Sequence, residues 1–350
     1  MTSRWAGIQE KAFRNERLTT EEALGIVRSS DQELLDVAAA AFDVRRRFFE
    51  QRVKLNYLVN IKSGLCSENC SYCSQSGISQ ADIPSYPLLS SEEIIACVDR
   101  GVAVGAARAC LVASGRNPSE REIDSIICSV RSLKEKYPRL EICTSLGFLE
   151  EAQATRLKEA GVFAYNHNIN TSESYYGKIC DSHTYQDRLR TLERAKRAGL
   201  SGCSGVLTGM GETDEDLVSM AFTLRDKNAD SIPVNFLMPM EGTLLEGVNH
   251  LSPQRCLRIL ALFRFVNPSV ELRIAGGREI HLRTLQPLGL MIANCIFIGD
   301  YLTTPGQSPR ADLEMIRDLG FQVVGQPDDF IERALDQLAF DAEKRSFSLA

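Results

Sequence analysis

The chain has 350 residues, of which 44% are hydrophobic and 25% are charged, and its formal net charge is −6. This composition is typical of a soluble globular protein, and the negative charge argues against a nucleic-acid binder, which usually carries a basic surface. The most apolar helix-like stretch, residues 257–266, is interrupted by Arg258 and Arg264, and the N-terminus lacks the apolar core of a signal peptide. We therefore expect a cytoplasmic protein that binds neither a membrane nor nucleic acid.

The first fifty residues are predicted to be helical. Residues 19–22 (Thr-Thr-Glu-Glu) have the pattern of a capping box ahead of an amphipathic helix, and residues 29–33 open a second helix in the same way. From Leu55 onward, short apolar runs alternate with longer amphipathic runs. We therefore expect an N-terminal helical extension over residues 1–50, followed by an α/β unit.

The alternating part contains predicted strands separated by predicted helices. The strands are expected at residues 57–61, 109–113, 141–145, 163–169, 202–207, 232–237, 271–275 and 295–299. The helices are expected at residues 91–104, 120–137, 150–160, 184–198, 214–227, 253–265 and 279–289. Helix ends are marked, as in glycine C-caps, by Gly101, Gly161, Gly199 and Gly289.

This order of elements predicts a (β/α)8 TIM-type barrel over residues 51–325. An open doubly wound sheet is the alternative, because a count of strands does not prove that the sheet closes. The tail over residues 326–350 is polar, with a predicted helix at 329–344, and no function is assigned to it.

The strongest chemical signal follows the first barrel strand, where Cys66, Cys70 and Cys73 have the spacing C-x3-C-x2-C. The chain has eleven cysteines, and in a reducing compartment clustered cysteines indicate metal ligation or redox chemistry rather than disulfides. Barrel enzymes place their chemistry at the carboxyl ends of the strands. Three thiolates there can hold three irons of a [4Fe–4S] cube and leave the fourth iron open to a substrate.

A structural zinc site is the alternative for this triplet. Such a site needs a fourth protein ligand. None lies near the triplet in the sequence, where the histidines are His167, His183, His250 and His281. We therefore favour the iron–sulfur cluster.

Three further cysteines, Cys110, Cys143 and Cys203, lie within predicted strands, and a fourth strand carries Arg273. Alternate positions of each barrel strand point inward, so these four side chains can converge in the lumen. A buried guanidinium needs an anionic partner, and a thiolate-ligated cluster could supply it, because the sequence shows no other partner set for Arg273. The alternative is three small core cysteines and one salt-bridged arginine.

The triplet, with Tyr72 before its last cysteine, resembles the radical S-adenosylmethionine (SAM) superfamily. The resemblance implies that the methionyl amine and carboxylate of SAM chelate the open iron. One electron from the reduced cluster then splits SAM into methionine and a 5′-deoxyadenosyl radical, which abstracts hydrogen from unactivated carbon.

Further segments are similar to the biotin synthase family, in register from about Leu18 to Phe321. They are residues 60–64 (NIKSG), 165–168 (YNHN), 202–205 (GCSG), 209–213 (GMGET), 276–279 (GGRE) and 302–305 (LTTP). This resemblance implies a radical SAM sulfurtransferase that converts dethiobiotin to biotin. It also implies that Cys110, Cys143, Cys203 and Arg273 hold a [2Fe–2S] cluster that gives up the sulfur, although arginine is a rare metal ligand because it holds its protons tightly.

The same resemblance implies the contacts of the substrate. Asn168 and Asn235 would hydrogen-bond the ureido ring of dethiobiotin, and Thr303 and Thr304 would lie near its carboxylate. Neutral amides suit a neutral urea, since both offer donors and acceptors.

The resemblance further implies that Tyr72, Arg188 and Asn170 contact SAM. Arg188 would meet the methionyl carboxylate, which a guanidinium binds well. Two departures from the family pattern concern the same cofactor. Asn170 stands where some relatives have an aspartate that contacts the ribose, and residues 113–115 read Ala-Ser-Gly rather than Gly-Gly-Glu.

The remaining cysteines match no ligand position and are predicted to be structural: Cys97, Cys128, Cys180, Cys256 and Cys295. His167 and His183 are predicted to be hydrogen-bonded scaffold residues rather than ligands or bases.

Three other functions compete with this interpretation. A methylornithine synthase or a hydrogenase-cluster maturase has a similar scaffold, but the retention of all four lumen ligands argues against both. The second is an iron–sulfur carrier or redox sensor without a substrate, and the third is a zinc-stabilised binding module. The family resemblance also implies a low-potential electron donor of the flavodoxin or ferredoxin type, and a homodimer.

Overall fold

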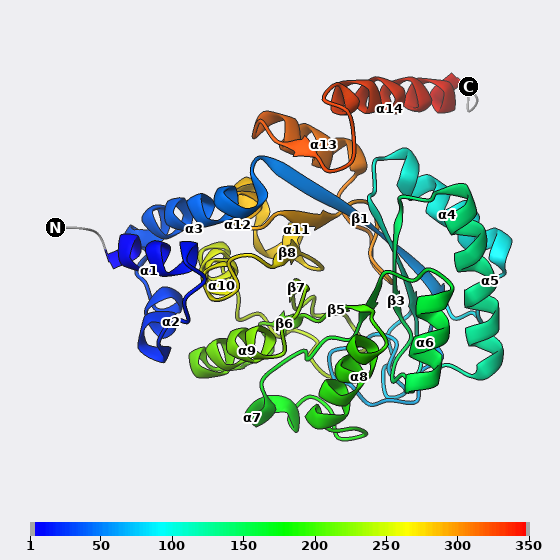
Figure 1. The fold of residues 1–350 in the computed structure, drawn as a ribbon, viewed down its shortest axis with the longest axis horizontal. Coiled ribbons are helices and arrows are strands. Elements are labelled where there is room, and N and C mark those ends of the chain that lie inside the picture. The colour runs from blue at the N-terminus through cyan, green and yellow to red at the C-terminus, as the bar shows by residue number, and fades with distance from the viewer. Residues whose placement is uncertain (1–3, 348–350) are drawn as a thin grey trace.

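The first strand of the sheet, β1 (Arg52–Lys62), has parallel neighbours on both sides in the computed structural model, which describes residues 4–347. It pairs with β2 (Arg108–Ala113) on one side and with β9 (Cys295–Phe297) on the other. The order β1-β2-β3-β4-β5-β7-β8-β9 therefore returns to its first strand (Figure 1). This closure confirms the predicted (β/α)8 barrel and excludes the open sheet.

The strand predicted at residues 202–207 is divided in two. The segments β5 and β6 both pair with β7, and Ser204 and Gly205 lie between them. A side chain at Gly205 would place its Cβ 1.9 Å from the Pro233 carbonyl oxygen, so the backbones approach too closely there for any residue but glycine. The other strands are β3 (Glu141–Ser145), β4 (Ala164–Asn166), β5 (Ser201–Cys203), β6 (Val206–Thr208), β7 (Ser231–Phe236) and β8 (Glu271–Ile274).

The first six predicted barrel helices agree with the structure to within one or two residues. They are α4 (Ser91–Ala103), α5 (Glu120–Lys136), α6 (Glu151–Glu159), α8 (Tyr185–Arg197), α9 (Asp214–Asp226) and α10 (Pro253–Val266). The helix predicted at 279–289 is instead α11 (Arg278–His281), a 3-10 turn and α12 (Gln286–Ile292). Arg283 has a φ of 52°, which interrupts the helix, and Pro287 then opens α12, where the missing N–H of proline is tolerated. A short helix, α7 (Glu173–Tyr176), was not predicted.

Two of the four glycines predicted as helix ends have that role. Gly161 and Gly199 follow α6 and α8 with φ values of 104° and 79°. Gly101 and Gly289 instead lie inside α4 and α12. An added Cβ would lie 2.5 Å from the Tyr57 ring at Gly101 and 2.9 Å from Leu282 at Gly289, so close packing rather than capping explains these two glycines.

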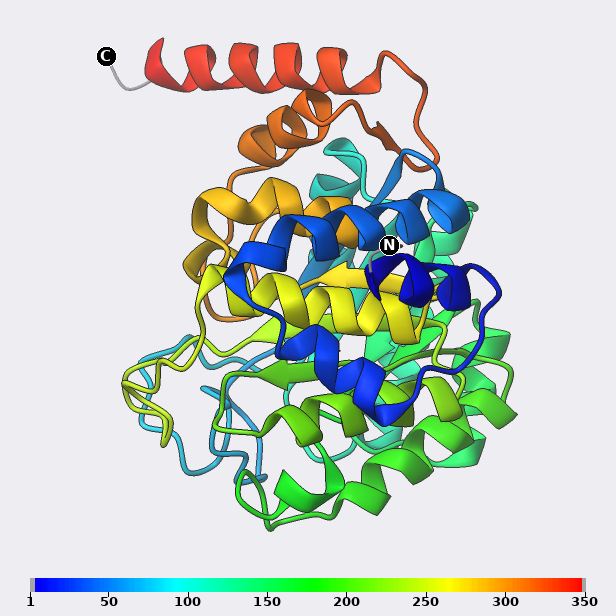
Figure 2. The same cartoon turned by 90° about the vertical axis from the view of Figure 1, so that its left-hand side faces the viewer.

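The N-terminal extension consists of α1 (Arg4–Phe13), α2 (Thr20–Val27) and α3 (Leu34–Phe49). The Thr19 hydroxyl accepts from the Glu22 N–H at 3.2 Å, and the Thr19 N–H donates to the Glu22 carboxylate at 2.8 Å, which confirms the capping box. The extension packs against α10 and α12 (Figure 2).

Because the extension covers it, α10 is buried on nearly all sides. Its Arg264 is fully buried and donates to the carbonyls of Ile292, Pro268 and Val270. Among the described residues, no helix has the length and apolar character needed to cross a membrane.

The C-terminal segment lies at one end of the barrel (Figure 1). After α13 (Pro309–Asp318), the short strand β10 (Gln322–Val323) pairs with the start of β1. The last helix, α14 (Phe330–Phe347), packs against α13 and corresponds to the helix predicted at 329–344.

Candidate active site

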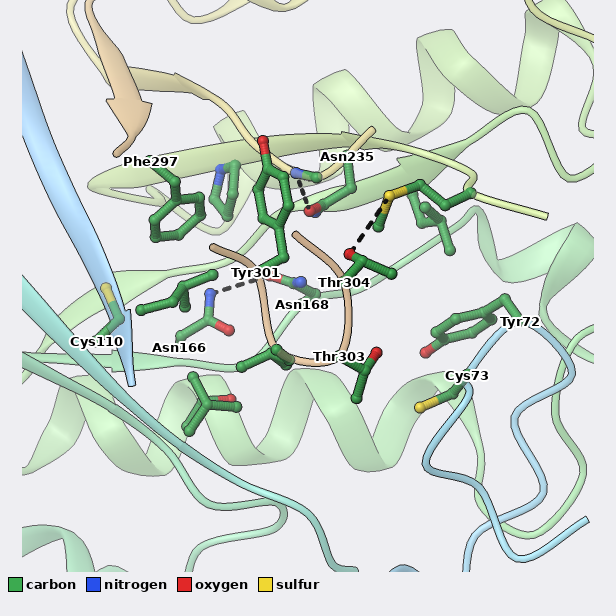
Figure 3. A pocket seen from close by; sticks show the side chains of 18 of the residues that line it. Tyr72, Cys73, Cys110, Asn166, Asn168, Asn235, Phe297, Tyr301, Thr303 and Thr304 are labelled. Carbon is green, nitrogen blue, oxygen red and sulfur yellow. Dashed lines mark hydrogen bonds between the residues drawn. The ribbon is translucent and has the colours of Figure 1, made fainter. Parts of the chain in front are cut away.

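One cavity of about 310 Å³ opens among the carboxyl ends of the barrel strands and gathers most of the predicted site residues. Figure 3 shows Tyr72 and Cys73 at one side of it and Cys110 at the other, with Asn168, Thr303 and Thr304 between them. Its lining includes Tyr72, Cys73, Cys110, Cys143, Asn168, Asn170, Asn235, Arg273, Thr303 and Thr304. Cys66, Cys70, Cys203 and Arg188 lie outside this lining.

The cysteine triplet lies in the loop that leaves the carboxyl end of β1. The Cys73 N–H donates to the Cys70 carbonyl at 3.2 Å, and the Gly77 N–H donates to the Glu68 carbonyl at 2.8 Å, so the loop curls on itself. Burial raises the pKa of the Cys73 thiol to about 11. A metal ion would have to displace this proton, because only the thiolate is a strong ligand.

The three lumen cysteines converge, as the strand register requires. Cys110 and Cys143 are direct partners in the β2–β3 ladder, and Cys203 lies on β5. All three are buried in one cluster. Hydrogen bonds from Cys143, followed by the nearby Arg273 guanidinium, lower the pKa of Cys110 and of Cys203 against the effect of burial. Contacts with both neighbours raise the pKa of Cys143 itself. The thiols of Cys110 and Cys203 therefore lose their protons more easily than that of Cys143.

The expectation that Arg273 has no protein partner is wrong. Its Nη2 donates to the Glu271 carboxylate at 2.9 Å and to the Ser231 hydroxyl at 3.1 Å. Glu271 lies two positions earlier on the same strand, hence on the same face. Toward the cavity, Nη1 lies 3.9 Å from the Cys203 sulfur, and Nε is buried without a partner among the described residues.

A charged network lies beneath the lumen cysteines and was missed by the sequence analysis. Arg108 donates to Glu141 at 2.8 Å and to Glu271 at 2.6 Å, and Lys54 donates to the same two carboxylates at 2.6 and 3.2 Å. With Arg273, three cations face two carboxylates, so one positive charge is left over. The period of two along a strand could have revealed this network, because Arg108, Glu141 and Glu271 each lie two residues before a predicted lumen ligand.

Polar side chains line the middle of the cavity. The Asn168 oxygen accepts from the Asn166 amide at 3.0 Å and from the Gly205 N–H at 2.9 Å, which leaves its own amide protons for a ligand. Asn235 donates to the Val206 carbonyl at 3.0 Å and accepts from the Gly276 N–H at 3.1 Å, so one donor and one acceptor position are left.

The threonines come from the loop after β9. The Thr303 hydroxyl shares a 2.9 Å hydrogen bond with Ser74 of the triplet loop, and the Thr304 hydroxyl lies 3.8 Å from the Met238 sulfur. The loop that carries the triplet and the loop that closes the barrel therefore meet at the mouth of the cavity (Figure 3).

The residues predicted to contact SAM lie beside the triplet. The Asn170 amide donates to the Tyr72 hydroxyl at 2.5 Å, and its backbone has a φ of 67°, which asparagine tolerates. Arg188 donates from Nη1 to the Asn168 carbonyl at 3.0 Å and from Nε to the Tyr176 hydroxyl. Burial lowers the pKa of Arg188, but the net shift is upward because of the nearby groups Tyr72, Tyr176 and Cys70. This guanidinium therefore stays charged. Nη2 of Arg188 takes part in neither of these two hydrogen bonds.

The remaining cysteines have different environments. Cys256 and Cys295 are buried, Cys97 is half-buried, and Cys128 is exposed. Cys180 is buried too, but its sulfur lies 3.8 Å from the sulfur of Cys70 in the triplet. The sequence analysis did not anticipate this contact, because it depends on how the loop before α8 returns to the barrel mouth.

The two histidines also differ. His183 shares hydrogen bonds with the Tyr176 hydroxyl at 2.7 Å and with the Glu68 carboxylate, so it has the scaffold contacts predicted for it. His167 packs against Phe148 with the two rings tilted and their centroids 5.2 Å apart, and its Nε2 is buried without a partner among the described residues. Packing, rather than hydrogen bonding through Nε2, therefore holds His167.

Comparisons with known proteins show which families and folds this chain is similar to. The Radical SAM superfamily model matches residues 60–224, and the model of the Biotin and Thiamin Synthesis associated domain matches residues 233–322. The fold is similar to the crystal structure of methylornithine synthase, with a TM-score of 0.78 at 21% identity over 94% of this chain and 100% of that one. It is equally similar to the FeFe-hydrogenase maturase of Carboxydothermus hydrogenoformans, with a TM-score of 0.78 at 19% identity over 94% of this chain and 81% of that one. Both likenesses concern the fold alone.

The chain is thus a radical SAM enzyme, and this superfamily implies a [4Fe–4S] cluster with SAM. It is 58% identical to the biotin synthase of Streptomyces coelicolor over 90% of this chain and 78% of that protein. It is 55% identical to the biotin synthase of Saccharopolyspora erythraea over 91% of this chain and 90% of that protein. It is 51% identical to the biotin synthase of Bacillus licheniformis over 92% of this chain and 96% of that protein. The chain belongs to the biotin synthase family.

Proposed function

We propose that this chain converts dethiobiotin to biotin by radical insertion of sulfur. The observation that carries the proposal is one cavity with thiols at both ends, Cys73 of the triplet at its mouth and Cys110 and Cys143 of the lumen set at its floor (Figure 3). When bound, the [4Fe–4S] cluster with SAM supplies 5′-deoxyadenosyl radicals that abstract hydrogen from the terminal methyl and the ring-adjacent methylene of dethiobiotin, and a [2Fe–2S] cluster supplies the sulfur that closes the thiophane ring.

Cys66, Cys70 and Cys73 fit the first cluster. They lie in one loop, which leaves the carboxyl end of β1 and folds on itself. Three thiolates in one loop can each bind a different iron of a cube and leave the fourth iron to SAM.

Cys110, Cys143, Cys203 and Arg273 fit the second cluster. The buried Nε of Arg273 lacks a partner, and the charged network around it carries one positive charge more than its carboxylates neutralise. A cluster held by three thiolates would bring the compensating negative charge. Glu271 accepts from Nη2 of Arg273, whereas Nη1 and Nε of the same guanidinium take no part in that ion pair.

The other polar residues would bind and orient the two small molecules. The free amide groups of Asn168 and Asn235 would hydrogen-bond the ureido ring of dethiobiotin, and the hydroxyls of Thr303 and Thr304 would hold its carboxylate near the mouth. Arg188 would meet the methionyl carboxylate of SAM through Nη2.

Tyr72 and Asn170 would form the wall against the nucleoside of SAM. Their mutual hydrogen bond fixes both side chains beside Cys73. The loops that carry Ser74 and Thr303 meet across the mouth, which would keep water away from the radical.

Several wider features are part of the same proposal. They are a cytoplasmic location, a homodimer, a flavodoxin- or ferredoxin-type electron donor, and a division of the chain into an extension (1–50), a barrel (51–325) and a C-terminal tail (326–350). The fold supports this division, because the extension packs on the outside of α10 and α12 and contributes no residue to the cavity lining.

The test uses anaerobically reconstituted enzyme with dethiobiotin, SAM and a low-potential reductant. Biotin and 5′-deoxyadenosine are quantified by mass spectrometry, with and without dethiobiotin. We expect biotin together with 5′-deoxyadenosine. Formation of 5′-deoxyadenosine without biotin, in enzyme that carries both clusters, would contradict dethiobiotin as the substrate.

A further inference from the structure

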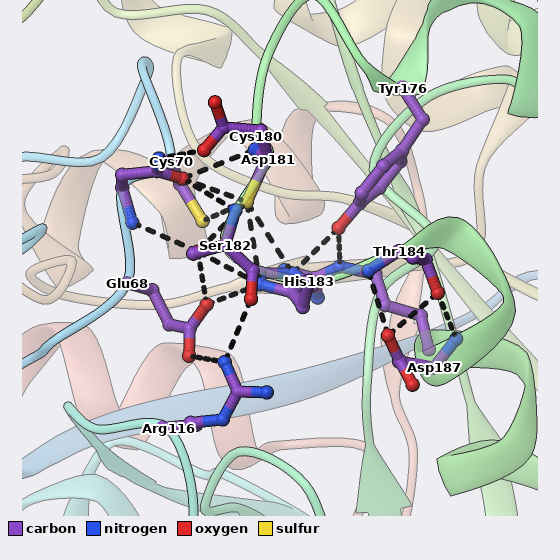
Figure 4. Close-up of polar contacts among 12 residues, drawn as sticks. Glu68, Cys70, Arg116, Tyr176, Cys180, Asp181, Ser182, His183, Thr184 and Asp187 are labelled. Carbon is purple, nitrogen blue, oxygen red and sulfur yellow. Dashed lines mark hydrogen bonds and ion pairs between the residues drawn. The ribbon is translucent and has the colours of Figure 1, made fainter.

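Three metal-binding side chains converge beside the triplet loop, and the proposed function uses only one of them. The sulfur of Cys180 lies 3.8 Å from that of Cys70 and 3.3 Å from Nδ1 of His183. The donor atoms of Cys70, Cys180 and His183 all lie within 4.8 Å of one another, and all three residues are buried (Figure 4). Cys180 and His183 come from the segment between α7 and α8, far from the triplet in sequence.

These distances match one tetrahedral ion. With zinc–sulfur bonds of about 2.3 Å and zinc–nitrogen bonds of about 2.0 Å, tetrahedral geometry places two sulfurs about 3.8 Å apart and a sulfur and a nitrogen about 3.5 Å apart. The observed separations of 3.8 and 3.3 Å are close to both values. In an iron–sulfur cube each thiolate binds a different iron, and the proposed function leaves the fourth iron to SAM, so Cys180 is not a ligand of that cube.

Glu68 contacts the imidazole of His183. Its side chain is buried, and one carboxylate oxygen contacts both His183 Nδ1 and the Ser182 hydroxyl, while the other accepts from Arg116 at 2.6 Å (Figure 4). Glu68 is not among the donor atoms that lie within 4.8 Å of one another, so the donor set is two thiolates and one imidazole, with a water as the fourth ligand, which zinc accepts.

The surroundings also orient the imidazole. His183 Nε2 lies 2.7 Å from the Tyr176 hydroxyl, which also accepts from Arg188. With Nε2–H donating to this hydroxyl, Nδ1 is the nitrogen that would bind the ion, in place of its contact with Glu68, and the Tyr176 partner is the outer-shell arrangement that metal-bound histidines use.

We propose that the cluster-free chain binds a single Zn²⁺ ion through Cys70, Cys180 and His183. The sequence shows no further ligand near the triplet, whereas the folded chain supplies two, Cys180 and His183. Cys70 belongs to both sites, so zinc and the [4Fe–4S] cluster exclude each other. This exclusion rests on the proposed function, whereas zinc binding itself does not.

The test titrates the full-length, reduced, cluster-free protein with Zn²⁺ against a chromophoric chelator, and with Co²⁺ as a spectroscopic probe. We expect one equivalent of zinc and a cobalt spectrum with thiolate charge-transfer bands. Cys180→Ser and His183→Gln should each weaken binding by at least about 100-fold, since loss of a direct ligand exceeds the effect of an outer-shell change. Cys66→Ser and the buried control Cys295→Ser should bind as the wild type does.

Two results would overturn the site. Binding that survives in Cys180→Ser and His183→Gln but is lost in Cys66→Ser would place the ion on the triplet instead. Absence of bound zinc in the folded wild type, checked by circular dichroism, would refute the proposal outright.

A second measurement tests the exclusion. Zinc-loaded and zinc-free protein are reconstituted with iron and sulfide, and visible absorbance and retained zinc are measured. We expect cluster formation in the wild type to fall with zinc loading, and in Cys180→Ser to be independent of zinc. Full cluster formation with zinc retained would contradict the shared ligand. Failure of biotin formation would leave the zinc titration unchanged, so the two proposals fail separately.

Discussion

Glu271 is the carboxylate on which the charged network under the lumen most depends. It accepts from Arg108 at 2.6 Å, from Arg273 at 2.9 Å and from Lys54 at 3.2 Å, and the two arginine side chains are only 3% and 1% exposed. Replacing Glu271 by Gln keeps its shape but leaves three cations facing Glu141 alone. Breaking a buried ion pair in this way costs about 3–5 kcal/mol.

The assay is urea unfolding of the cluster-free protein at pH 7, followed by far-ultraviolet circular dichroism. We expect E271Q to lose about 3–5 kcal/mol of the free energy of unfolding. The matched control is Glu193→Gln, since Glu193 pairs with Lys227 at the surface with its side chain 44% exposed, and it should lose under about 1 kcal/mol.

The pH dependence provides an independent check. Burial raises the pKa of Glu271, but Arg108, Arg273 and Lys54 outweigh it and lower the pKa below its ordinary 4.5. Because the pKa is lowered, the charged Glu271 stabilises the fold fully above pH 4.5, and this stabilisation is lost as the pH falls below that value. The difference in free energy of unfolding between wild type and E271Q should therefore shrink below pH 4.5. A loss as small as that of the control at pH 7, or a difference that grows on acidification, would refute this reasoning.

Two further predictions concern the scaffold. Gly205→Ala would force a Cβ against the Pro233 carbonyl and should cost about 3 kcal/mol in urea unfolding, whereas Gly7→Ala in α1, with open space around it, should be neutral or stabilising. Equal effects of the two substitutions would contradict the close-approach argument. Thr19→Ala removes the cap of α2 and should cost about 1 kcal/mol in the same assay, while exposed Thr20→Ala should stay within about 0.5 kcal/mol. A loss in Thr20→Ala as large as in Thr19→Ala would show that the capping box is not the cause.

The sequence predicted the parts of the molecule that depend on local pattern. The alternation of strands and helices predicted the barrel, and the two-residue period placed Cys110 and Cys143 on one inward face, where they pair directly. Thr19 and Glu22 predicted their capping box for the same reason, because both partners lie within one turn.

Features that depend on tertiary contact were not predictable. Cys180 reaches Cys70 only because the loop before α8 returns to the barrel mouth, across 110 residues of sequence. The division of the strand at Gly205 depends on the approach of Pro233 from β7. The burial of Arg264 depends on the extension that covers α10, which no pattern within α10 reveals.

The most direct test of the central proposal compares Cys73→Ala with Cys143→Ala in the reconstituted assay with dethiobiotin and SAM. If the triplet generates the radical and the lumen set supplies the sulfur, Cys73→Ala should form neither 5′-deoxyadenosine nor biotin. Cys143→Ala should still form 5′-deoxyadenosine but no biotin, and Cys295→Ala, a buried cysteine outside both sets, should form both products. Biotin formation by Cys143→Ala at the wild-type yield would contradict the role of the lumen cysteines.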